Sequence, residues 1–172
     1  DIKIENVTST NHKTAGIRLG SKSSVDLNNI SLTGVKGQNS TGIELSDSKA
    51  RMNAIKSSNH SCVITLKNES DVEFVGGNTH TDDKEIIKVV VATGEKPSAI
   101  KDDTNQYLQT SQGTQGGTGT QEIYYGFFET KEVNTVDELI TAVSQSNRII
   151  NLNQDIELKE ELQISGQNVI IN

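Results

Sequence analysis

The sequence predicts an all-β protein that folds as a β-solenoid, with one short amphipathic helix toward its C-terminal end. Two observations predict this fold class: an apolar pattern that recurs about every two dozen residues, and a composition with only 32% hydrophobic and 3% aromatic residues. In a solenoid each repeat forms one coil that stacks on the next, so the core is a thin column that needs few apolar side chains. The same composition disfavours a compact enzyme with a thick core.

Two apolar motifs define the repeat. The first is a short strand whose central isoleucine recurs at Ile17, Ile43 and Ile64. The second has apolar residues at offsets 0, 2 and 5, and its successive copies begin at Ile2, Val25, Ala50 and Val72. Because no helical period separates the motifs, each coil is expected to consist of short strands joined by turns rich in Gly, Asn, Ser and Thr.

Charged residues at the outward positions support this alignment. Between the first two apolar residues of the second motif, successive coils carry Lys3, Asp26, Arg51 and Glu73, so the charge alternates. The other strand carries Arg18, Glu44 and Thr65 at its equivalent position. Opposite charges on neighbouring strands stabilise a sheet by roughly 0.5 kcal/mol, whereas like charges destabilise it.

Asparagines at equivalent turn positions predict a second stacking interaction. Asn6 and Asn29 follow the second apolar residue of their motifs by the same distance. Asparagine tolerates a left-handed backbone and can hydrogen-bond to its neighbours through its side chain. The next equivalents are Ala54 and Gly76, so we expect only a short asparagine ladder.

The repeat pattern divides the chain into three parts. Residues 1–95 form the β-helix coils and end with a β-branched run at 85–93. Residues 96–122 lose the pattern, and their Gly, Ser, Thr and Gln content is typical of a flexible linker. Residues 123–172 contain the predicted helix and the first coils of a β-helix. Because residues 169–171 lie inside a strand pattern, we expect the sequence to be a piece of a longer protein.

The helix is predicted from its cap and its apolar stripe. Thr135 and Glu138 have the spacing of a capping box. The stripe consists of Val136, Leu139, Ile140 and Val143. Strands are expected after the helix at 149–152, 156–158, 162–164 and 169–171. A short helix before the first coil is one way to cover the open apolar end of a solenoid, which would otherwise pair with other chains.

The segment 133–143, followed by 148–158 and 162–164, resembles the N-terminal cap and first coil of pectate-lyase-like β-helices. The pattern is V-x-T-x-x-E-L-x-x-A-V, then I-x-L-x-x-D-I-x-L and L-x-I. It is most similar to the pectate-lyase-like adhesive domains on surface proteins of Gram-positive bacteria. The resemblance implies a right-handed parallel β-helix, export, wall attachment and adhesion. Coils before a cap indicate that one β-helix ends and another begins; a single permuted β-helix is the alternative.

Charge and composition restrict the partners. A net charge of −7, from 16 Lys+Arg and 23 Asp+Glu, argues against nucleic-acid binding. No apolar run approaches the roughly 20 residues of a membrane span, so membrane insertion is not expected. The single cysteine, Cys62, has no partner for an internal disulfide, and we interpret it as a small buried residue of the strand at 61–66 rather than as a reactive thiol.

Acidic residues and arginines are the candidates for a lyase site. A pectate lyase needs carboxylates to hold Ca²⁺ and an arginine as base. The carboxylate candidates are Asp26, Asp47, Asp71 and Glu73, and the arginines are Arg18, Arg51 and Arg148. Asp26 and Glu73 belong to the alternating row, which favours a charge ladder over a cation site.

The remaining candidates are interpreted as structural residues. A hydrolase needs two carboxylates in a cleft, and the nearest pair, Asp82-Asp83, follows His80 in what we interpret as a polar turn rather than a metal site. His12 and His60 also lie in polar turns. The aromatic residues Tyr124, Tyr125, Phe127 and Phe128 are expected to pack beneath the helix rather than to stack on sugars. Asn-x-Ser/Thr triplets at Asn6, Asn29, Asn39, Asn59 and Asn68 are interpreted as turns.

The sequence therefore assigns no catalytic residue, no cofactor and no metal ligand. It predicts a non-catalytic adhesion module of a secreted or wall-anchored bacterial protein, which contacts polysaccharide, or a glycan or protein on a host or neighbouring cell, through a β-helix face. Many weak contacts would be multiplied by avidity. The alternative is a polysaccharide lyase or hydrolase whose active site lies on other coils. A viral or phage fibre is a third hypothesis, and self-association through the solenoid ends stays open.

Overall fold

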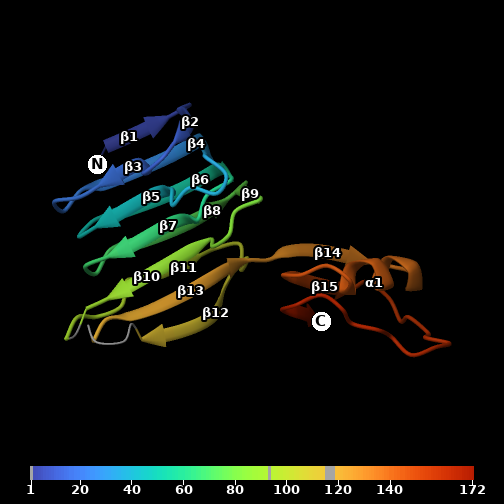
Figure 1. The fold of residues 1–172 in the computed structure, drawn as a ribbon. Helices are drawn as coiled ribbons and strands as arrows, with labels where there is room; N and C mark the ends of the chain where they lie inside the picture. The colour runs from blue at the N-terminus through green and yellow to red at the C-terminus, as the bar shows by residue number, and fades with distance from the viewer. Residues whose placement is uncertain (1, 93, 115–118) are drawn as a thin grey trace. The chain divides into compact units, whose positions relative to one another are not determined.

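The computed structural model describes residues 2–92, 94–114 and 119–172. The chain forms two compact units, Asp1–Tyr125 and Gly126–Asn172. Strands stacked in parallel coils make a β-solenoid of about 7 turns, accompanied by one short helix (Figure 1). The predicted all-β solenoid is therefore confirmed.

The first sheet of the first unit contains the strands of the second motif. These strands are β1 (Ile2–Glu5), β2 (Thr8–His12), β4 (Ser24–Gly34), β6 (Lys49–Ser58), β8 (Asp71–Gly76), β9 (Thr79–Thr81) and β11 (Ile100–Asp102). The order is β1-β4-β6-β8-β11, while β2 pairs with β4 and β9 pairs with β6. Every pair is parallel, as expected when successive coils stack in one direction.

The second sheet contains the strands of the first motif. It is built from β3 (Ala15–Leu19), β5 (Thr41–Ser46), β7 (Cys62–Lys67), β10 (Ile87–Val91), β12 (Tyr107–Thr114) and β13 (Gln121–Phe127). The order is β12-β13-β10-β7-β5-β3. The pairs from β3 to β10 are parallel, but β13 pairs with β10 in the antiparallel direction, so the stacking of like coils ends at β10 in this sheet.

The pairing register confirms the repeat alignment. One row of successive partners consists of Ile17, Ile43, Ile64 and Ile87. The other consists of Ile2, Val25, Ala50, Val72 and Ile100. Ile43, Ile64 and Ile87 are fully buried. Stacking like residues thus builds the thin apolar column that the low hydrophobic content predicts.

The alternating charges also stack as predicted, and the row is one residue longer than expected. Lys3, Asp26, Arg51 and Glu73 are successive partners, and Lys101 follows Glu73. Glu73 lies 3.7 Å from Arg51 and also forms an ion pair with Lys101. Glu73 is half-buried and its two partners are exposed, so solvent weakens each of these ion pairs.

The asparagine ladder is confirmed, with one change in its continuation. The Nδ2 of Asn29 donates to the Oδ1 of Asn6 at 2.7 Å, and both residues have left-handed backbones, with φ of 52° and 55°. Ala54 comes next, with φ of 53°. The register then shifts by one residue, so Gly77 (φ 66°) rather than Gly76 lies over Ala54.

The segment 96–122, indicated as a linker by its composition, contains strands where the structure describes it. Strands β11, β12 and the start of β13 fall in this range. Ile100 continues an apolar row of the first sheet, and Tyr107 is buried. The glycine-rich residues 115–118 lie outside the described residues.

The second unit is a small parallel sheet covered by a helix. It contains β14 (Glu129–Val133), α1 (Val136–Val143), β15 (Arg148–Leu152) and β16 (Val169–Ile171), with the strands in that order. The predicted capping box is present, because Thr135 Oγ1 accepts from the Glu138 amide at 3.3 Å and the Glu138 carboxylate accepts from the Thr135 amide at 3.2 Å. An asparagine pair recurs here: Asn168 Nδ2 donates to Asn147 Oδ1 at 2.9 Å.

Two details of the second unit differ from the sequence prediction. Ile140 is 50% exposed, whereas Ala142 is buried with Leu139 and Val143 against Ile150 of β15. The segments 156–158 and 162–164 are not strands, since no described strand pairs with them. Their residues Ile156 and Leu162 only pack against the edge of the small core.

Replacing Ala54 tests the backbone strain at the end of the asparagine ladder. An L-residue other than asparagine or glycine is disfavoured by about 1 kcal/mol in the left-handed region. We expect Ala54→Asn to raise the free energy of unfolding by about 1 kcal/mol in urea denaturation, because it relieves this strain and can donate to Asn29 Oδ1. Ala54→Gly is the control that relieves strain without a new hydrogen bond. If both variants were no more stable than the wild type, this account of the turn would be wrong.

Candidate functional site

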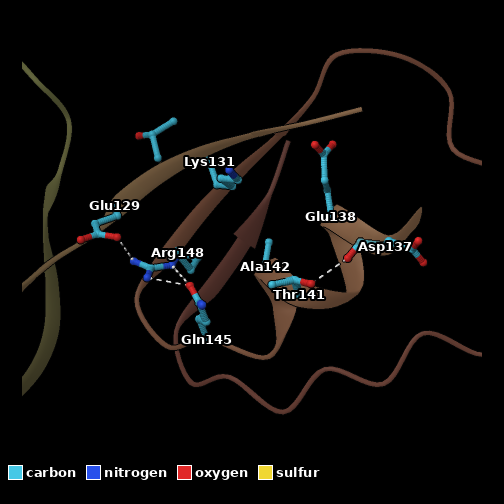
Figure 2. Close-up of a pocket in the computed structure, with 9 residues that line it drawn as sticks. Glu129, Lys131, Asp137, Glu138, Thr141, Ala142, Gln145 and Arg148 are labelled. Carbon is cyan, nitrogen blue, oxygen red and sulfur yellow. Dashed lines mark hydrogen bonds and ion pairs between the residues drawn. The ribbon is translucent and has the colours of Figure 1, made fainter. Parts of the chain in front are cut away.

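The second unit contains a pocket between β14 and α1 that is lined mostly by polar and charged residues. The pocket has a volume of roughly 490 Å³. It is lined by Glu129, Thr130, Lys131, Asp137, Glu138, Thr141, Ala142, Gln145 and Arg148. In Figure 2, Lys131 lies between the Arg148 cluster on one side and the helix residues Asp137 and Glu138 on the other. The pocket therefore presents both hydrogen-bond donors and acceptors.

Arg148 is held rigidly at one wall of this pocket. Its Nη1 lies 2.6 Å from a carboxylate oxygen of Glu129, and its Nε and Nη2 donate to Gln145 Oε1 at 2.9 and 2.7 Å. Glu129 neutralises the guanidinium. Because Gln145 uses its carbonyl oxygen for Arg148, its amino group can donate elsewhere.

On the opposite wall, the charged Glu138 side chain is part of the helix cap. The Glu138 carboxylate accepts hydrogen bonds from the backbone amides of Asn134 and Thr135, and these bonds, the one from Asn134 most, hold the pKa of Glu138 below its usual value. Lys131 also lowers this pKa through space, but among the described residues no carboxylate lies within ion-pair distance of its amine. Lys131 is thus the pocket cation that is not neutralised by direct contact.

The lining residues can bind a polar ligand. The Lys131 amine, the Thr130 hydroxyl and the Gln145 amino group are donors, and Asp137 offers a carboxylate acceptor. Such a mixture can hydrogen-bond to a sugar, and the lysine can also hold an anionic substituent. The described residues of the pocket include no serine, cysteine or histidine that could form a nucleophile–base pair.

The first unit buries a second polar feature, a hydrogen-bonded chain that includes all three histidines of the sequence. Its members, in order of contact, are Ser9, His12, His60, Asp83, Ser57, His80 and Tyr107. We call this set the histidine chain. It connects strands β2, β6, β9 and β12 with the turns on either side of them.

Asp83 is the centre of the histidine chain. Its Oδ1 accepts from His60 Nδ1 at 2.9 Å and from the His60 amide at 2.8 Å, and its Oδ2 accepts from Ser57 Oγ at 2.6 Å. The side chains of His60 and Asp83 are both fully buried. Burial acts to raise the pKa of Asp83, but the hydrogen bonds from His60 and Ser57 outweigh it and leave the pKa below its usual value.

His12 and His60 come from coils that are not adjacent, and their side chains meet at the level of the coil between them. The two Nε2 atoms are 2.9 Å apart. The coil between them has glycines beside the two rings. Gly34 is the register partner of His12, and a Cβ at Gly42 would lie 3.5 Å from His60 Nε2. A Cβ at Gly34 would lie 2.7 Å from the Asn59 carbonyl oxygen and 3.0 Å from the His60 ring. The absence of a side chain makes the contact possible.

The structure brings together residues that the sequence assigned to separate polar turns. His12, His60, His80 and Asp83 all join the histidine chain, whereas Asp82 is exposed. Among the described residues, no group of three or more His, Cys, Asp or Glu side chains is placed to hold a metal ion. A signal existed for His80, since Ser9, Leu32, Ser57 and His80 form one inward row of register partners.

The candidate carboxylates of a lyase site lie in different surroundings. Asp71 pairs with Lys49 at 3.0 Å, and Glu73 lies between Arg51 and Lys101. Asp26 stands in register between Lys3 and Arg51. Asp47 occupies a turn with φ of 51°. Asp26 and Glu73 therefore belong to a ladder of alternating charges rather than to a cation site, because each of them has cationic neighbours in the adjacent coils.

Cys62 and the aromatic residues lie in the sheets or beside them. Cys62 is buried in β7, and burial raises the pKa of its thiol to about 11, so it is a poor nucleophile. The sequence predicted that Tyr124 and Tyr125 pack beneath the helix; the structure places them on β13, opposite Lys88 and Ile87 of β10. The Lys88 amine lies 5.8 Å from the centre of the Tyr124 ring. Phe128 is buried, whereas Phe127 is half-buried.

Comparison with known proteins assigns no family. No family model matches the chain, and comparisons with curated proteins and with solved structures give no significant match. The pectate-lyase-like resemblance and the handedness that it implies therefore stay predictions. Within the described residues, no helix has the length and apolar character needed to cross a membrane.

Gly34→Ala tests the close approach of the two histidines. The added methyl group would lie 2.6 Å from Ser40 Oγ and 2.7 Å from a backbone oxygen, so something must shift. We expect thermal or urea denaturation to show a loss of about 2 kcal/mol or more, as for overpacked sites. The matched control is Gly20→Ala, whose Cβ would meet only the Ser46 oxygen at 3.9 Å. Equal stabilities of the two variants would contradict the proposed close packing.

Proposed function

We propose that the chain is a non-catalytic binding module of a secreted or surface-attached bacterial protein, and that it contacts polysaccharide. The observation that carries the proposal is the pocket beside α1, where Lys131 lies among polar side chains and no carboxylate of the described residues contacts its amine. A uronic-acid sugar would place its carboxylate on the Lys131 amine and its hydroxyls against Thr130, Asp137 and the Gln145 amino group. The fixed Arg148 contact keeps Gln145 oriented for this role.

The pocket is consistent with weak, repeated contact. The pocket is open to solvent and lined mostly by polar residues, so one sugar would bind with low affinity. Many copies displayed on one surface would convert weak contacts into adhesion through effective concentration. Attachment to a cell wall and adhesion to host or neighbouring cells belong to this proposal.

Substituting Lys131 tests the binding proposal. The whole chain is titrated with polygalacturonate and, separately, with a neutral dextran, and binding is measured by calorimetry or on a biosensor surface. We expect Lys131→Gln to weaken polygalacturonate binding about tenfold, since a charge-assisted hydrogen bond contributes about 1.5–3 kcal/mol. Lys159→Gln, an exposed lysine of the same unit outside the pocket, is the matched control.

Two outcomes would count against the proposal. If the wild type did not bind polygalacturonate, or if Lys131→Gln and Lys159→Gln bound it equally well, the pocket would not be the contact. The lyase alternative is tested in the same samples by adding Ca²⁺ and recording ultraviolet absorbance, because elimination creates an unsaturated sugar that absorbs. A Ca²⁺-dependent rise would replace the binding module with an enzyme.

A further inference from the structure

We propose that the histidine chain is an acid-sensitive lock that holds β9 and β12 in the first unit and releases them when His80 takes up a proton. The proposal rests on the direction of the hydrogen bonds, which the geometry determines almost completely. It is independent of the pocket beside α1.

The donors can be assigned one after another, starting from the Asp83 carboxylate. An ionised carboxylate only accepts, so Ser57 must donate its single hydroxyl proton to Asp83 Oδ2. The Ser57 oxygen, 2.6 Å from His80 Nδ1, then accepts from that nitrogen. Neutral His80 therefore carries its proton on Nδ1, and its Nε2 lone pair accepts from the Tyr107 hydroxyl at 2.8 Å.

The Tyr107 hydroxyl is the donor to His80 when His80 is neutral. Asn78 uses its Oδ1 to accept from the Ile55 amide at 2.9 Å, so its amino group faces the Tyr107 oxygen. Tyr107 is 4% exposed, and its ring stacks on Phe74 with centroids 3.8 Å apart. The tyrosine thus accepts from Asn78 and donates to His80 at a site where water does not replace a lost bond.

A second proton on His80 reverses this arrangement. Protonated Nε2 becomes a donor toward Tyr107, so the buried tyrosine hydroxyl can no longer donate to His80. A buried positive charge also appears where burial already lowers the pKa of His80 to about 4. Asp83 opposes this effect and His60 adds to it; Asp102, whose carboxylate accepts from the Tyr107 amide, is the other charged group facing the tyrosine.

The opposite end of the histidine chain keeps its hydrogen bonds when it takes up a proton, although burial also lowers the pKa of His12. His60 Nδ1 donates to Asp83, and only one proton fits between the two Nε2 atoms of His12 and His60. A proton added at His12 Nδ1 turns this atom from an acceptor into a donor toward Ser9 Oγ, 3.3 Å away, and the hydrogen bond between the two Nε2 atoms is kept. No hydrogen bond is lost. The sensitive step is therefore at His80, next to β12.

The sign of the pH dependence follows from the lowered pKa. A locally open state binds a proton with the ordinary histidine pKa near 6.5, whereas the closed state binds it only near 4. Closure is complete above pH 6.5 and weakens as the pH falls toward 4. Between pH 7 and 4.5 the opening equilibrium should rise on the order of 100-fold.

Amide hydrogen exchange measured at pH 7 and 4.5, corrected for the intrinsic rate, tests the lock on the whole chain. In the wild type we expect protection to fall in 79–81 and 107–112, and much less in 25–34. His80→Gln, which keeps a donor and an acceptor but cannot titrate, should abolish the local fall. His12→Gln is the matched control and should retain it. An unchanged wild-type profile, or an equal fall in His80→Gln, would overturn the proposal.

A second measurement covers the case in which His80→Gln does not fold. Proton NMR of the imidazole Cε1–H groups resolves the titrations of the three histidines. We expect one of them to titrate near pH 4 in the wild type and to move upward in Tyr107→Phe, because that variant has no hydroxyl whose donation to His80 would be lost. If no histidine titrated below pH 5, or if Tyr107→Phe left all three unchanged, His80 would not be the trigger.

Discussion

In-register stacking of parallel coils is the constraint on which the rest of this structure depends. Each position recurs at a spacing of about 4.8 Å, so a side chain must suit the equivalent residue in the coils on either side of it. Isoleucine rows, alternating charges and paired asparagines are three solutions to the same requirement. The second unit reuses one of them, because Asn147 and Asn168 pair as Asn6 and Asn29 do.

This constraint explains why much of the fold could be predicted from one sequence. Equivalent residues of successive coils are neighbours in space, so residues that recur along the sequence are also in contact. The alignment of Ile17, Ile43 and Ile64 in the sequence therefore already predicts which residues pair. The capping box of Thr135 and Glu138 could also be predicted from the sequence, since the two residues are three positions apart. Prediction weakened where recurrence stopped: β12 and β13 leave the repeat, and composition alone indicated a linker.

The candidate sites were harder to predict for the same reason. Lys131 and Arg148 face one pocket only because α1 packs on β15 through Leu139 and Ala142, a detail that the apolar stripe did not resolve. In the histidine chain, the partners of His60 lie in coils on either side of it and do not repeat. His60 resembles a turn residue when it is considered in its own coil, and its role becomes visible only in the assembled solenoid.

The contact of His12 with His60 through the glycines of the coil between them also makes the coils distinguishable. Similar repeats could in principle assemble one coil out of step, because their apolar rows would still match. A shifted assembly would place His12 against an ordinary coil rather than against Gly34, and would bury an imidazole without its partner. The middle coil therefore helps to determine the order in which the coils stack. Deleting or duplicating it would alter more than the length of the solenoid.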